Sequence, residues 1–514
     1  MLILVIVFVL SVSYYAYFRS TRGHLYELSR RLPSVGQLPV LGHMHWFIGG
    51  PERILNNIQI LANKIEASGG LGQVWIGPTI YAVILNPADI QTVLEKCLQK
   101  DASYKFLRTW LGNGLFVAPV DLWKVHRRLL LPLFHNRVVE SYTEVFGKHS
   151  EVLVQRLQEN VGGPEFDVFK YVTRCSLDIV FETAMGERMD LQLKPENGYV
   201  SARNAVMSII NMRLFKAWLQ LDAVFNLTPY ASVQKENIQL THQFTDEVIR
   251  KKRLLRENFN ASPTGYEGKH NAANIWADLD VIIIIEDMLL SRDYPFSDEQ
   301  LREHIDSITI AGNDTTSLVV AYALVLLGSH TGEQDKVYRE LKQIFGESKR
   351  IPTKEDLNKM EYLERAIKET MRLYTVVPVI ARETQTELKL STCTLPAGVG
   401  CAIVPFVLHR SKRLWGPDAD DFRPDRFLPE NSVDRHPCAF IPFSYGGRNC
   451  IGRYFGMLAI KSLLASILRT YEVSAKPCGT LKIEILLIPV SGHMVTLRKR
   501  NSCLKGATSE LVPF

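Results

Sequence analysis

The sequence predicts a mainly α-helical protein with small β-sheets, built as one large domain behind an N-terminal transmembrane anchor. Helical periodicity dominates from Ile90 to Tyr374, strand patterns are short and few, and no long polar linker divides the chain. With 46% hydrophobic and 22% charged residues, the 514-residue chain has enough apolar side chains for a large buried core. This composition excludes a disordered or collagen-like protein.

The first 18 residues are predicted to form the anchor. Leu2 to Phe18 is an uncharged run near the lower length limit, about 17 residues, of a membrane-spanning helix. Arginines follow this run and none precedes it, so the positive-inside rule places the body in the cytosol. The alternative is a cleaved secretory signal, which normally begins with a basic segment that this chain lacks.

Residues 19–42 combine these arginines with Pro33, Gly36, Pro39 and Gly42 and are predicted to be a hinge, which leaves residues 43–514 as the folded domain. Early in the domain, β-branched and aromatic residues predict a hairpin over Gln73–Leu85. Asn86-Pro87 then provides the N-cap and first residue of a helix. Near the carboxyl end, a segment rich in Pro, Asp and Arg predicts a coil from Trp415 to Pro442.

A long central helix is predicted to begin at Ser297, where S-D-E-Q forms a capping box, and to run to about His330. At about 1.5 Å per residue it is about 50 Å long, so its middle must be buried. That middle reads AGNDTT from Ala311, although Gly, Asp and Thr all disfavour a helix. Two interpretations remain open. Either another helix crosses here at a packing notch, or a distorted turn lies beside a ligand, where Asp314 and Thr315 pass protons inward.

Cys450 is the candidate metal ligand. It ends the Gly-rich loop that begins at Phe443, just before a helical run from Arg453 to Leu468. Backbone N–H groups and a helix N-terminus lower the pKa of a thiol, which favours a thiolate. A lone cysteine is more often a small buried hydrophobic residue. Because no His or second Cys lies nearby in the sequence, Cys450 cannot complete a zinc site, and haem with its four nitrogens remains as the acceptor.

The same loop resembles the haem-binding signature of the cytochrome P-450 superfamily, F-x-x-G-x-R-x-C-x-G. Its fixed positions are Phe443, Gly446, Arg448, Cys450 and Gly452. Three further motifs are similar to those of the superfamily and occur in the same order. They are W-x-x-x-R at Trp123 and Arg127, A-G-x-D-T-T at 311–316, and E-x-x-R at Glu369 and Arg372.

The resemblance implies a cytochrome P-450 fold with a single large haem domain. It implies that Cys450 is the axial ligand of a non-covalent haem b, and that Asp314 and Thr315 serve oxygen activation. Further cofactor contacts are implied for Trp123, Arg127, Arg382, Arg448 and Phe443.

Glu369 and Arg372, taken alone, predict a surface salt bridge worth about 0.2 to 0.5 kcal/mol on the polar face of a helix. The resemblance implies instead that the following coil buries both residues and that Arg426 joins them. Their role would then be structural support for the coil that presents Cys450.

No flavin or nicotinamide motif occurs, so the resemblance implies that electrons from NADPH arrive through a separate cytochrome P-450 reductase, and it allows cytochrome b5 as a further partner. A basic patch of Lys412, Arg413, Arg448 and Arg453 is predicted to dock the reductase. The net charge of +6 is small for this length, and no nucleic-acid partner is expected.

Several stretches, such as TWLGNGLFVAP at 109–119, are similar to family four, the fatty-acid-hydroxylase-like branch. Many members of that branch carry a Glu where this chain has Ala311, which argues against a covalent haem link and against terminal fatty-acid hydroxylation. The resemblance thus implies a monooxygenase of the endoplasmic reticulum membrane that faces the cytosol and inserts one oxygen atom into a fatty acid, terpenoid, steroid or xenobiotic. Two alternatives remain open: a reductase-independent isomerase or dehydratase, and a non-catalytic membrane haem or ligand binder.

Overall fold

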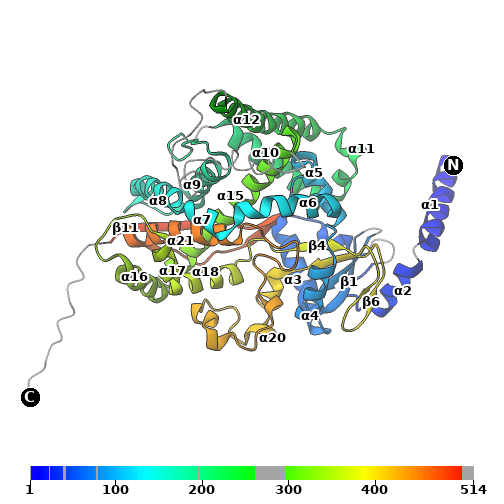
Figure 1. Ribbon diagram of the computed structural model, residues 1–514. Helices are drawn as coiled ribbons and strands as arrows, with labels where there is room; N and C mark the ends of the chain where they lie inside the picture. The colour runs from blue at the N-terminus through cyan, green and yellow to red at the C-terminus, as the bar shows by residue number, and fades with distance from the viewer. Residues whose placement is uncertain are drawn as a thin grey trace, which may run out of the picture.

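The computed structural model describes residues 2–21, 23–38, 42–76, 79–194, 197–260 and 296–500. Helices make up most of the body, and several small sheets lie among them (Figure 1). The prediction of a mainly α-helical protein with small sheets is confirmed.

The long central helix, α15 (Asp298–Ser329), organises the core. Ser297 caps it in the predicted capping box with Gln300, and it ends at His330. Within the described residues, α15 is the helix that is long and apolar enough to cross a membrane, but 72% of its apolar window is buried inside the protein. It is therefore a core helix.

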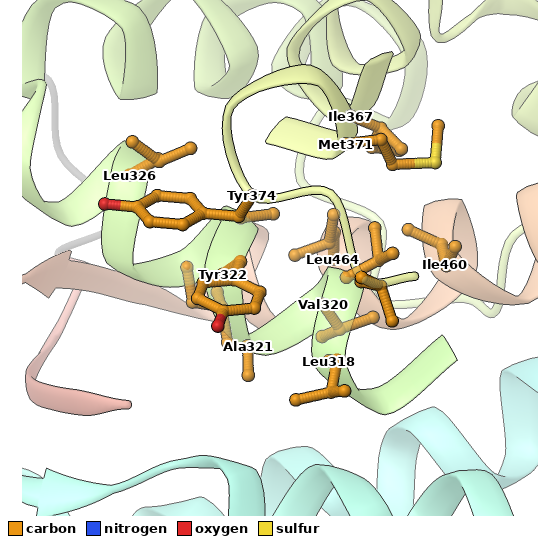
Figure 2. Close-up of a cluster of buried hydrophobic side chains, with 14 of the residues drawn as sticks. Leu318, Val320, Ala321, Tyr322, Leu326, Ile367, Met371, Tyr374, Ile460 and Leu464 are labelled. Carbon is orange, nitrogen blue, oxygen red and sulfur yellow. The ribbon is translucent and has the colours of Figure 1, made fainter. Parts of the chain in front are cut away.

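The buried half of α15 packs against α9 (Phe169–Val180), α18 (Glu361–Leu373) and α21 (Arg453–Thr470). Figure 2 shows part of this core, including the rings of Tyr322 and Tyr374, which stack with centroids 4.5 Å apart. The surrounding apolar side chains labelled there are Leu318, Val320, Ala321, Leu326, Ile367, Met371, Ile460 and Leu464.

The largest sheet has the strand order β1-β2-β7-β4. β1 (Leu71–Ile76) and β2 (Thr79–Ile84) form the predicted antiparallel hairpin, whose turn residues 77–78 lie outside the described part. β7 (Gly400–Ile403) runs parallel to β2 and pairs with β4 (Ile380–Glu383) on its other side. A bridge between Lys100 and Arg382 joins the sheet to the segment after α4. This arrangement brings distant basic residues together.

The amino end contains α1 (Leu2–Thr21) and α2 (Gly23–Arg31), and α1 projects away from the body (Figure 1). Apolar side chains of α1 such as Phe8 are exposed. By contrast, Leu25 and Leu28 of α2 are buried, and Tyr26 stacks on Trp75 with ring centroids 5.3 Å apart. Much of the segment predicted to be a hinge is thus helical and docked on the sheet, because α2 buries an apolar face there.

The other described helices and strands complete the fold. The helices are α3 (Pro51–Ala67), α4 (Pro87–Lys96), α5 (Lys105–Leu111), α6 (Val120–Leu130), α7 (Asn136–Ser141), α8 (Thr143–Leu157), the π-helical turn Phe181–Met185, α10 (Gly198–Phe215), α11 (Asp222–Phe225), α12 (Pro229–Asn260), α16 (Thr331–Phe345), α17 (Lys354–Lys359), α19 (Pro405–Leu408) and α20 (Lys412–Trp415). The strands are β3 (Phe166–Asp167), β5 (Leu388–Lys389), β6 (Thr394–Leu395), β8 (Tyr471–Ser474), β9 (Leu481–Glu484), β10 (Leu486–Pro489) and β11 (Met494–Lys499). Between α20 and α21 the chain is coil with short 3-10 turns, as predicted.

Candidate active site

The loop before α21 presents Cys450. Gly446 has a φ of +69°, and a Cβ atom there would lie 2.2 Å from the carbonyl oxygen of Leu94, so this position requires glycine. The Cys450 N–H donates to the carbonyl oxygen of Phe443 at 2.9 Å. The half-buried Phe443 ring lies beneath the guanidinium of Arg453, 5.8 Å from its centroid. The loop is therefore fixed at both of its ends.

Burial raises the pKa of the Cys450 thiol, while the Gly452 N–H and the cations Arg127 and Arg453 lower it. Burial has the largest effect, and the Gly452 N–H acts in the direction that the sequence predicts for a loop N–H. Cys450 is nevertheless an exposed residue. A metal ion that binds the sulfur there displaces the proton.

Three cations lie together near this loop. Arg448 donates from Nε to the carbonyl oxygen of Leu98 at 3.0 Å and from Nη2 to that of Ala118 at 2.7 Å. Its Nη1 and the Nε of Arg382 are buried and without partners in the described part of the chain. Lys100 faces both arginines, and its pKa is lowered first by burial and then by their charges. Such a cluster needs an anion, and a group with two carboxylates fits it.

Trp123 and Arg127 lie on α6 beside the same loop. The guanidinium carbon of Arg448 is 4.3 Å from the centroid of the Trp123 ring. Arg127 donates to the carbonyl oxygen of Asn449 at 2.8 Å and to its Oδ1 at 2.6 Å. Arg127 thus ties α6 to the residue that precedes Cys450.

The middle of α15 is a regular helix. The Thr315 hydroxyl donates to the carbonyl oxygen of Ala311 at 2.7 Å. A Cβ atom on Gly312 would lie 3.1 Å from Val180 of α9, so the glycine is a packing notch where α9 crosses. Of the two interpretations left open by the sequence, the backbone, which stays helical here, supports the packing notch and not the distorted turn. Yet Ala311 is exposed and Gly312, Asp314 and Thr315 are partly exposed, although the helix is otherwise mostly buried. These residues form an accessible strip.

Asp314 forms an ion pair with Arg203 of α10. Both side chains are largely shielded from solvent, at 15% and 5% exposed. The Nδ2 of Asn313 also donates to Asp314 Oδ1 at 3.2 Å. Sequence reasoning missed Arg203, because it lies more than 100 positions away and no motif marks it. The carboxylate of Asp314 is thus held in a fixed orientation.

Glu369, Arg372 and Arg426 lie together in the interior. Arg372 donates from Nε and Nη2 to the two carboxylate oxygens of Glu369 at 2.7 and 2.8 Å, and both side chains are 0% exposed. Arg426 Nε lies 3.3 Å from Glu369 Oε1. Arg372 Nη1 donates to the carbonyl oxygens of His409 and Ala419 at 2.9 and 2.6 Å. The group joins α18 to the coil that precedes the Cys450 loop.

A model of the cytochrome P450 family matches residues 32–496. The chain belongs to the cytochrome P450 family. It is 34% identical over 498 residues to cytochrome P450 4c3 of Drosophila melanogaster, covering 94% of this chain and 92% of that protein. It is also 34% identical to cytochrome P450 4V2 of Homo sapiens, covering 84% of this chain and 82% of that protein.

The crystal structure of the cytochrome P450DA heme domain superposes with a TM-score of 0.77 at 24% identity, covering 92% of this chain and 98% of that chain. The predicted cytochrome P450 fold is confirmed. The family assignment makes the protein a haem-thiolate monooxygenase, an oxidoreductase, and favours this activity over the isomerase and binding-protein alternatives.

Haem is the cofactor of the cytochrome P450 family, and the residues of this site are suited to bind it. The unpartnered guanidinium nitrogens of Arg382 and Arg448 and the amine of Lys100 are complementary to the two haem propionates. Lys100 was missed at the sequence level, because its place follows from the bridge to Arg382 and from no local motif.

The basic patch predicted for this cytochrome P450 does not include Arg448, which is buried. Two other members of the predicted patch lie near acidic side chains, Lys412 3.7 Å from Asp420 and Arg413 3.7 Å from Glu66. Four other basic residues of α6, α7 and α21 are exposed and have no ion pair within the described ranges. They are Lys124, Arg128, Arg137 and Arg453.

Proposed function

We propose that this cytochrome P450 inserts one oxygen atom from O2 into a lipophilic small molecule, using electrons that a separate reductase delivers from NADPH. The observation that carries the proposal is the exposed Cys450 beside two arginines whose buried nitrogens have no partner among the described residues. Fatty acids, terpenoids, steroids and xenobiotics are the candidate substrate classes. Bound haem supplies the iron at which oxygen is activated.

Cys450 is proposed as the iron ligand, with Arg382, Arg448 and Lys100 neutralising the propionates and Trp123 packing beneath Arg448. Haem binding is proposed to be non-covalent, because Ala311 offers no carboxylate for an ester bond.

An apolar cluster supports a lipophilic substrate. Ile310, next to Ala311 in the accessible strip of α15, packs against this cluster. Its buried members include Phe106, Trp110 and Val206, from α5 and α10. Substrate sites are mostly lined by such side chains, and a few polar groups then orient the substrate.

Asp314 and Thr315 are proposed to hold and pass the protons that oxygen reduction consumes. Replacing Thr315 with alanine is expected to lower the yield of product per NADPH by roughly tenfold or more, because the hydroxyl that relays protons is lost. Coupling is measured with the reductase-reconstituted enzyme and a panel of the four substrate classes. Thr316→Ala is the matched control, since the neighbouring Thr316 also carries a hydroxyl but is only 5% exposed and lies outside the accessible strip. Equal coupling in both variants would remove Thr315 from the relay.

We place the protein in the endoplasmic reticulum membrane with its body in the cytosol. The exposed apolar residues of α1 support this, as do Trp218, Leu221 and Leu227, which are 60%, 63% and 88% exposed around α11. Exposed apolar surface of this kind is typical of contact with lipid or another apolar partner.

The basic surface of Lys124, Arg128, Arg137 and Arg453 is proposed to bind the acidic face of the reductase. It lies on the Cys450 side of the protein, because Arg127 links α6 to Asn449. The double variant Lys124→Glu/Arg128→Glu is expected to slow electron transfer by about tenfold at low salt, with a smaller effect at high salt. Stopped-flow reduction checks this.

Lys412→Glu/Arg413→Glu is the matched control, because those two cations lie beside carboxylates of this chain. Equal electron-transfer rates for the two double variants, at unchanged haem content, would place the reductase elsewhere.

A further inference from the structure

A second group of buried ionisable side chains lies where α12 packs on α15. Asp306 is 1% exposed, and its Oδ1 accepts a hydrogen bond from the hydroxyl of Thr245 at 2.7 Å. Its Oδ2 is buried and has no hydrogen-bond partner among the described residues. The nearby His242 Nε2, on a side chain that is 25% exposed, lies 3.7 Å from that oxygen. The partly exposed side chain of His242 thus lies between Asp306 and the surface.

The hydroxyl of Tyr199 is a second buried group without a partner in the described ranges. Its ring packs between Phe181 and Phe244, with centroids 5.4 and 4.8 Å away. Burial raises the pKa of Tyr199, the charges of Asp306 and Asp314 raise it further, and that of Arg203 lowers it. The phenol therefore lies within electrostatic reach of these three charged residues.

The helical spacing accounts for this arrangement. Asp306 and Asp314 are eight residues apart on α15, about two turns, and so share a face. Tyr199 and Arg203 are four residues apart on α10 and share a face as well. Arg203 pairs with Asp314, and the charge of Asp306 raises the pKa of Tyr199, one turn away from Arg203 on α10. Buried polar atoms without protein partners usually form hydrogen bonds with ordered water molecules.

We propose that Asp306 and Tyr199 form a proton path that supplies Asp314 from the surface at His242. The proposal rests on the proposed role of Asp314 and Thr315. A proton leaves the Asp306 carboxyl for the Tyr199 oxygen, directly or through water, as the hydroxyl proton moves on to the Asp314 carboxylate. Asp306 then takes a proton from solvent by way of His242. One proton enters for each proton delivered, and no electron moves.

The pKa of Asp306 suits a residue that accepts and releases a proton. Burial raises its pKa to about 7, against the Thr245 hydrogen bond and Arg302, which lower it. Both protonation states are then populated near neutral pH, as efficient proton transfer requires. The ionisable groups that face Asp306 are His242 and Asp246 from α12, Tyr199 from α10, and Arg302 and Glu303 from α15 itself.

The test uses Tyr199→Phe and Asp306→Asn in the holoenzyme with its reductase. Each variant is expected to lower product per NADPH by about threefold or more, and Asp306→Asn is expected to abolish the change in coupling near pH 7. Tyr322→Phe is the control, since that buried hydroxyl donates to the carbonyl oxygen of Leu487 at 3.0 Å, outside the path. A loss of coupling in Tyr322→Phe equal to that in Tyr199→Phe would overturn the path.

A second measurement is independent of turnover. Because the pKa of Asp306 is higher in the folded than in the unfolded protein, the folded state holds an extra proton between about pH 4 and 7. This contribution to stability is lost as the pH rises through 7, and Asp306→Asn is expected to remove that loss. Identical pH profiles of unfolding for the wild type and Asp306→Asn would overturn the assignment.

The outcomes separate this path from the proposed function. If Thr315→Ala uncouples the enzyme but Tyr199→Phe and Asp306→Asn do not, the path through α10 is wrong and the role of Thr315 stands. If Thr315→Ala leaves coupling intact while the other two variants lower it, the path does not act through Thr315, and the proposed relay fails instead.

Discussion

Replacing Cys450 with alanine is expected to abolish stable haem binding. Cys450 is exposed and close in sequence to Arg448 of the cation cluster, and in the described part of the chain no group of three or more His, Cys, Asp or Glu residues forms another metal site. Haem content per protein is expected to fall by about tenfold or more. The reduced protein with carbon monoxide should lose its red-shifted Soret band.

Cys438→Ala is the matched control. Cys438 is 0% exposed in the coil before the same loop, and burial raises the pKa of its thiol to about 12, so it stays an uncharged buried side chain. Its removal should leave the haem spectrum unchanged at a modest cost in stability. Wild-type haem content and the red-shifted band in Cys450→Ala would refute the ligand assignment.

Features encoded by adjacent residues were predictable from the sequence. The capping box placed the start of α15 at Ser297, and runs of β-branched and aromatic residues predicted the hairpin of β1 and β2. The loop around Cys450 was recognised because its glycines and arginine have fixed spacing. Gly446 shows the physical reason, since any side chain there would collide with Leu94.

Features that depend on contacts between distant segments were not predictable. Lys100 joins Arg382 only through a bridge between segments nearly 300 residues apart. Arg203 reaches Asp314 from another helix, and neither residue carries a pattern that announces the pair. The burial of Glu369 likewise depends on a coil about 50 residues later in the chain, so its helix alone indicates a surface position.

Replacing Arg372 with alanine is expected to destabilise the fold more than any surface substitution. The variant leaves the Glu369 carboxylate buried without its main partner, and removing one member of such a pair costs about 3 to 5 kcal/mol. That is a large part of the 5 to 15 kcal/mol, roughly, that stabilises a typical domain. The denaturant midpoint of the purified holoenzyme checks the effect.

The matched control on the same helix is Arg365→Ala. The Arg365 side chain is 20% exposed and lies 3.7 Å from Asp425, so its loss is expected to cost about 1 kcal/mol or less. Arg426→Gln, which removes the second cation while leaving Arg372 in place, serves as a milder variant if Arg372→Ala does not accumulate.

Loss of the Arg372 side chain should affect the haem site through His409. Arg372 Nη1 donates to the carbonyl oxygen of His409, whose ring Nε2 accepts from the Ile441 N–H at 2.9 Å, two residues before Phe443. Burial and the charge of Arg372 lower the pKa of His409 to about 3, so the ring is neutral and able to accept. Arg426→Gln is therefore expected to reduce the fraction of protein with the red-shifted band even where it remains folded. If Arg372→Ala and Arg365→Ala unfold at the same denaturant concentration, the buried group does not support the Cys450 loop.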